Sequence, residues 1–201
     1  MSSGFSLLAC FYLVAHPVGF GVTAVSANDV WAVGFFNIGF FNQTLTLHWD
    51  GSSWSVVSSA NANTQDNELS GVAAVSTTDV WAVGEFISGS SVETLIEQWN
   101  GSSWSVVTSP AAGQLKGIAI VSANDIWAVG EFVDPNTSTT TTVIEQWNGT
   151  AWSVVTSPNP SASENILNAA AADVSTSQAW GVGEFFNTTN NVLETLTEFN
   201  P

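Results

Sequence analysis

The chain has 201 residues and a formal net charge of −16, and its only Lys or Arg side chain is Lys116. A nucleic-acid-binding face needs clustered Lys and Arg to displace phosphate counterions, so nucleic acid is excluded as a partner. The same lack of cations disfavours an anionic lipid surface. With 45% hydrophobic residues, among them 10 Trp and 12 Phe, the composition predicts a folded protein rather than a disordered one.

The cysteine count and the apolar runs bound the class of protein further. Cys10 is the single cysteine, so an intrachain disulfide is excluded. The longest apolar run, residues 5–15, is too short to span a bilayer, so no transmembrane segment is predicted. A surface dominated by Ser, Thr, Asn and Gly is typical of extracellular proteins. We therefore expect an extracellular or cell-surface location.

In chain order, an N-terminal segment at residues 1–17 is followed by four repeats of about fifty residues, at 18–60, 61–112, 113–160 and 161–201. Each repeat contains one copy of a phrase that first reads Asp-Val-Trp-Ala-Val-Gly, called the Trp phrase below. The first three repeats also contain a second phrase, which in the second repeat reads Trp-Asn-Gly-Ser-Ser-Trp-Ser-Val-Val. We expect these four repeats to form one domain.

Each repeat has the pattern of four short strands, expected in the second repeat at residues 71–75, 80–86, 94–99 and 104–108. The Asn100-Gly101 pair is a two-residue hairpin signal between the last two of these strands. The strand with the Trp phrase is apolar on both faces, and the strand before it is rich in small residues, as expected for stacked blades. The chain is therefore predicted to be all-β, a four-repeat β-propeller with four-stranded blades. A β-solenoid is the alternative.

The fourth repeat ends after its third strand, and the N-terminal segment contains a candidate for the missing one. Residues 10–17 match residues 103–110 in register, aromatic on aromatic and Pro on Pro. We predict that residues 1–17 provide a closing strand that completes the last blade, because this removes an exposed sheet edge. Alternatively the strand is donated to a neighbouring chain, which gives a larger ring or a filament.

The two phrases resemble the Trp-rich propeller-type repeats found in tandem in predicted extracellular proteins of bacteria, and the resemblance extends from about residue 11 to residue 200. It implies a propeller fold and an extracellular location. It implies no particular activity.

Carboxylates recur directly after the Trp phrase, at Glu85, Glu131 and Glu184. Glycoside hydrolysis uses a pair of carboxylates, but an active site places its acid and its base in different environments and so breaks repeat symmetry. Because these residues recur in step with the repeat, we predict a structural role for them, with a ring of axial carboxylates along a solvated channel as the functional alternative. The aspartates that open the first three Trp phrases are predicted to accept turn N–H groups.

Other catalytic and cofactor signatures are missing from the sequence. His16, His48 and Cys10 match no zinc spacing, and there is no nucleophile elbow and no phosphate-binding loop. No metal, no cofactor and no catalytic residue is predicted, and the protein is not expected to be an enzyme. A glycosidase-like enzyme is the third functional alternative.

The long variable loops are expected on one face of the propeller, with the short uniform turns on the other. Binding sites usually lie on such loops, so we predict a non-catalytic binding or adhesion module that recognises carbohydrate or a cell-surface polymer there. A self-assembling structural subunit that uses the N-terminal strand is the alternative. Five Asn-x-Ser/Thr sites are glycosylation candidates: Asn42, Asn100, Asn136, Asn148 and Asn187.

Overall fold

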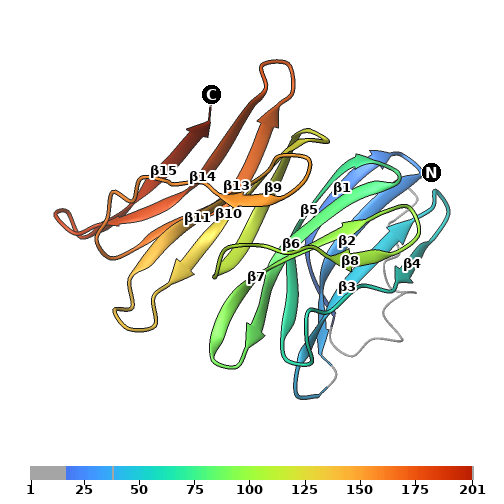
Figure 1. The fold of residues 1–201 in the computed structure, drawn as a ribbon, viewed down its shortest axis with the longest axis horizontal. Coiled ribbons are helices and arrows are strands. Elements are labelled where there is room, and N and C mark those ends of the chain that lie inside the picture. The colour runs from blue at the N-terminus through green and yellow to red at the C-terminus, as the bar shows by residue number, and fades with distance from the viewer. Residues whose placement is uncertain (1–16, 38, 201) are drawn as a thin grey trace, which may run out of the picture.

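The computed structural model describes residues 17–37 and 39–200 as fifteen strands in four consecutive antiparallel sheets, called blades 1 to 4 (Figure 1). Blade 1 contains β1 (Pro17–Ser26), β2 (Asp29–Asn37), β3 (Asn42–Trp49) and β4 (Trp54–Val57). Blade 2 contains β5 (Asn67–Ser76), β6 (Asp79–Ser88), β7 (Ser91–Trp99) and β8 (Trp104–Val106). Blade 3 contains β9 (Gln114–Ser122), β10 (Asp125–Val133), β11 (Thr140–Trp147) and β12 (Trp152–Val154). Blade 4 contains β13 (Asn165–Asp173), β14 (Gln178–Asn187) and β15 (Val192–Asn200).

Each blade is an antiparallel meander whose strands follow sequence order. The first strands of successive blades, β1, β5, β9 and β13, pack against one another. Figure 1 shows the blades as an arc, with β1–β4 at one end and β13–β15 at the other. The predicted all-β fold of four propeller-type blades is confirmed. The predicted closing strand lies outside the described residues except for Pro17, which belongs to β1.

Tryptophan pairs join blade 1 to blade 2 and blade 2 to blade 3. Trp31 of β2 is 2% exposed, and its ring centroid lies 5.0 Å from that of Trp99 and 5.3 Å from that of Trp104 in blade 2. Trp81 of β6 is buried in the same way against Trp147 and Trp152 of blade 3, at 5.0 and 5.6 Å. Aromatic pairs of this kind contribute about 0.5–1.5 kcal/mol beyond the area that they bury.

The glycine that ends each Trp phrase allows the first two strands of a blade to approach closely. A Cβ on Gly84 would overlap the carbonyl oxygen of Glu68, and a Cβ on Gly34 would overlap that of Val18. The register between β5 and β6 shifts beside this contact, between Leu69 and Gly71. The glycine is therefore required by backbone packing at a bulge.

The aspartates of the first three Trp phrases have a different role from the predicted one. The Gln98 amide donates to Asp79 at 2.9 Å across the sheet, and Gln146 and His48 contact the equivalent aspartates of their own blades. In blade 2 the turn N–H of Thr78 donates to the Ser76 hydroxyl instead. Each aspartate thus ties the second strand of its blade to the third. The prediction was wrong because the side chain opposite on the next strand reaches the carboxylate.

Buried glutamates tie consecutive blades together on their third strands. Glu97 of β7 is fully buried and accepts hydrogen bonds from the Ser59 hydroxyl at 2.6 Å and from the Ala60 N–H at 3.3 Å. Ser59 and Ala60 follow the last strand of blade 1. Glu145 of blade 3 accepts in the same way from Ser109. Burial raises the pKa of Glu97 from its ordinary 4.5 to about 7, because the charged form loses its hydration.

This raised pKa makes stability depend on pH. The folded state holds the Glu97 proton more tightly than the unfolded state does. The contribution of this proton to the unfolding free energy is therefore complete below pH 4.5 and is lost as the pH rises through 7. The unfolding free energy of the unaltered protein should fall between pH 5 and pH 8. In Glu97→Gln this fall should be smaller by about 2 kcal/mol, as measured by urea denaturation at each pH. Asp50→Asn is the control, because the pKa of Asp50 is lowered to about 2, outside this range. An unchanged slope in Glu97→Gln would contradict the assignment.

Candidate functional site

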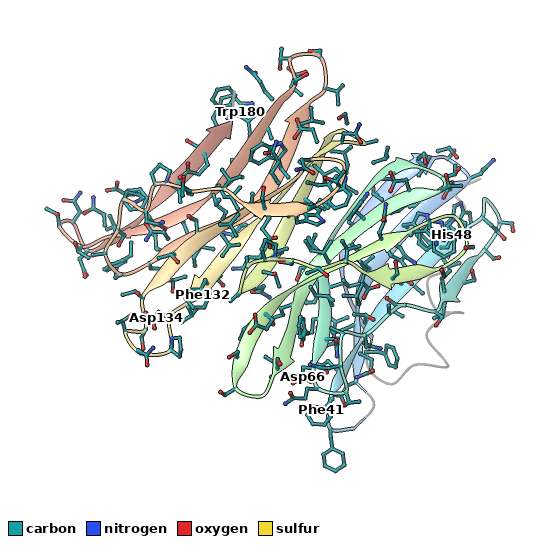
Figure 2. The ribbon with its side chains drawn as sticks, in the orientation of Figure 1. Phe41, His48, Asp66, Phe132, Asp134 and Trp180 are labelled. Carbon is teal, nitrogen blue, oxygen red and sulfur yellow. The ribbon has the colours of Figure 1, made fainter. Side chains whose placement is uncertain are left out.

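The long loops gather on one face of the arc. The connections between blades bond to the hairpin loops after the second strands: the Asn42 N–H donates to Asp66 at 2.6 Å, and the Gly89 N–H donates to Gln65 at 2.8 Å. On the other face, the short turns pack on each other, as Gly101 does on Thr78. Figure 2 shows Phe41, Asp66, Phe132 and Asp134 along the loop edge, with Trp180 far from it. The predicted separation of variable loops from short turns is therefore observed.

A groove of about 690 Å³ lies on this face between blades 2 and 3. It is built by the β6–β7 hairpin, the connection that leads into β9, and the β10–β11 hairpin. Its apolar lining includes the half-buried Phe132 and the exposed Val92 and Val133. Its carboxylates are Glu85, Glu93 and Glu131.

Two of the predicted carboxylates meet in this groove, but their surroundings differ. Burial, together with the negative charges of Glu68 and Glu131, raises the pKa of Glu85 from 4.5 to about 7. Glu131 instead forms an ion pair with Lys116, whose ammonium lies 2.9 Å from a Glu131 oxygen. Lys116 also lowers the pKa of Glu85, which offsets part of the rise. The repeat symmetry expected of these glutamates is therefore broken at this site.

The third predicted carboxylate lies outside the groove, and several residues of the site were not predicted. Glu184 lies on β14 of blade 4 and does not line the groove. Glu93, Lys116 and Phe132 were missed by the sequence reasoning. The one available signal was Lys116, because the only Lys in so acidic a chain must be close to carboxylates somewhere.

The five glycosylation candidates lie in loops or at the strand ends beside them. The Oδ1 atoms of Asn100 and Asn148 accept N–H bonds within the short turns after the third strands. Asn136 is exposed in the β10–β11 loop. The Nδ2 atoms of Asn42 and Asn187 donate to Glu68 and Glu194. The Nδ2 atom of Asn136 donates to Asp134 at 3.3 Å. An N-glycan attaches at Nδ2, so Asn42, Asn136 and Asn187 present an amide that is already engaged.

Residues 17–37 and 39–200 contain neither a metal-binding cluster nor a membrane-spanning helix. No cluster of three or more His, Cys, Asp or Glu side chains in this part of the chain is arranged to hold a metal ion. No helix there has the length and apolar character needed to cross a membrane. His48 is engaged with Asp29 at 2.9 Å and stacks on Trp31 at 4.4 Å, which accounts for its place on β3.

Comparisons with known proteins add likeness of fold only. No family model matches the chain, and no curated protein matches it in sequence. A solved structure described as YCF48 bound to D1 peptide is similar with a TM-score of 0.48 and 16% identity, over 90% of this chain and 53% of that one. A structure described as a glycoside hydrolase is similar with a TM-score of 0.46 and 8% identity, over 92% and 69%. The chain thus spans about half the length of the first of these structures.

The effect of Lys116 on the carboxylates of the groove can be tested by removing its charge. We expect Lys116→Met to raise the pKa of Glu85 above about 7, because the ammonium that lowers it is removed. A ¹³C carboxyl titration followed by NMR measures the change. Glu97 provides an internal reference, because its raised pKa has no contribution from Lys116. A Glu85 pKa that stays the same or falls would contradict the described electrostatics.

Proposed function

We propose that the chain is an extracellular, non-catalytic binding module that takes carbohydrate, or another hydroxyl-rich surface polymer, in the groove between blades 2 and 3. The observation that carries this proposal is the combination, in one groove, of carboxylate acceptors with an apolar wall. Carboxylates accept hydrogen bonds from sugar hydroxyls, and the ring of Phe132 suits the C–H face of a sugar.

The charge state of the groove supports a neutral ligand over a cationic one. Glu85, with a pKa of about 7, is protonated in a large share of molecules at neutral pH. The charge of Glu131 is offset by the ammonium of Lys116. The groove is therefore much less negative than the net charge of the whole chain implies. A protonated Glu85 can both donate a hydrogen bond to a sugar hydroxyl and accept one from it.

Binding to a broad glycan array and to a panel of cell-wall polymers tests the proposal. For ligands that bind, we expect Phe132→Ala and Glu93→Gln each to weaken binding about tenfold, the loss of about 1.4 kcal/mol. Phe41→Ala is the matched control, because Phe41 is exposed on the same face in blade 1 and does not line the groove. Blank results on both the array and the panel would overturn the proposal, and so would equal loss in the control.

Glycoside hydrolysis is the second candidate, favoured by the unequal surroundings of Glu85 and Glu131. An acid with a raised pKa beside an ionised carboxylate is the arrangement that such chemistry uses. Assaying the same ligands for cleavage products separates the two functions. Hydrolysis that Glu85→Gln abolishes would replace the binding proposal with an enzymatic one, whereas binding without cleavage supports the non-catalytic module.

A further inference from the structure

The tryptophan contact between blades joins the second-strand tryptophan of one blade to a tryptophan pair of the next blade. At the two ends of the arc, blade 4 presents such a second-strand tryptophan and blade 1 presents such a pair. On blade 4, Trp180 takes the position of Trp31 and Trp81, and it is 45% exposed. On blade 1, Trp49 and Trp54 form a receiving pair with centroids 5.9 Å apart and an interplanar angle of 47°. The pair of blade 2 on which Trp31 packs has almost the same geometry, at 6.0 Å and 47°. Among the described residues, no ring of another blade packs on Trp49 or Trp54.

The exposed face of blade 4 is apolar beyond its tryptophan. Val182, Leu193 and Phe199 are each between 43% and 53% exposed. In blades 2 and 3, the strand that corresponds to β14 is buried on both faces, because a further blade covers it. The surface of blade 4 is therefore the kind that another blade of this protein covers.

A hollow of about 200 Å³ lies beside β15, where the described residues give blade 4 three strands instead of four. Trp127 of blade 3 and Phe199 of blade 4 line it. In blades 2 and 3, the tryptophan that begins the fourth strand packs on the second-strand tryptophan of the preceding blade. Within the described residues β15 pairs with β14 alone, so its outer edge is open to a further strand.

We propose that a second copy of this chain docks head to tail on blade 4, with its Trp49 and Trp54 on Trp180 and its residues 11–13, which match β8 of blade 2, paired along β15. The match between residues 10–17 and 103–110 puts Phe11 at the Trp104 position, next to the hollow. In the second copy this segment runs directly into β1, as residues 103–110 run toward β9. One copy therefore supplies both the missing strand and the covering blade.

The contact is between copies because the two halves lie apart within one chain. Blades 1 and 4 occupy opposite ends of the arc (Figure 1). The proposed contact continues an interface that the chain already makes three times, between each pair of consecutive blades. Such a head-to-tail contact gives a closed ring or an open filament, depending on the rotation between copies. The inference is independent of the ligand groove, which lies between blades 2 and 3.

Sedimentation velocity of the full chain over a series of concentrations tests the inference. We expect the unaltered protein to associate, and Trp180→Asp and Phe11→Asp each to weaken the association at least about tenfold. Phe40→Asp is the control, because Phe40 is 95% exposed in the loop between β2 and β3 and should not alter association. Circular dichroism and thermal unfolding establish that each variant is folded.

Mixing the two variants tests the direction of the contact. Trp180→Asp keeps an intact blade 1 end, and Phe11→Asp keeps an intact blade 4. Each alone should stay monomeric at concentrations where the unaltered protein is associated, and an equimolar mixture should form a one-to-one dimer. A monomeric unaltered protein at every concentration, unimpaired association in either variant, or a mixture that stays monomeric would overturn the proposal.

Discussion

The second-strand tryptophan of each blade depends on the next blade to cover it. Trp31 and Trp81 are almost fully buried, and the third and fourth strands of the following blade bring two further tryptophans against each of them. A single blade has no such cover, so the fold is stable as an array in which each unit completes its neighbour. The glycine of the Trp phrase and the hydrogen bonds to Glu97 and Glu145 support this stacking by bringing strands close and joining blades.

Charge pairing contributes little to the structure, and hydrogen bonds take its place. Lys116 and Glu131 form the one ion pair between a lysine and a carboxylate in the described part of the chain. Elsewhere, Asn, Gln, Ser and Thr side chains bond the loops to one another and to carboxylates. Two of these carboxylates, Glu97 and Glu145, lie in the core, where burial raises their pKa. An acidic chain can bury them because they hold a proton more readily there.

The repeat, the strands and the two loop faces were predictable from the sequence because they follow from periodic signals. The Trp phrase recurs, and pairs such as Asn100-Gly101 mark the hairpin turns directly. The difference between the two glutamates of the groove was not predictable, because it depends on one irregular residue. Lys116 stands at a bulge of β9, where blade 2 has Ser70, and it makes Glu131 differ from Glu85. Glu85 and Glu131 occupy equivalent positions of the repeat, so the repeat alone predicts the same surroundings for both.

The most direct test of this account compares one buried tryptophan with its exposed equivalent, at protein concentrations low enough to keep the chain monomeric. Urea denaturation should show that Trp81→Ala lowers the unfolding free energy by about 3–5 kcal/mol, because it leaves a cavity between blades 2 and 3. Trp180→Ala should lower it by less than about 1 kcal/mol, because no further blade covers Trp180 in the monomer. Equal losses in the two variants would contradict the view that coverage by the next blade stabilises the fold.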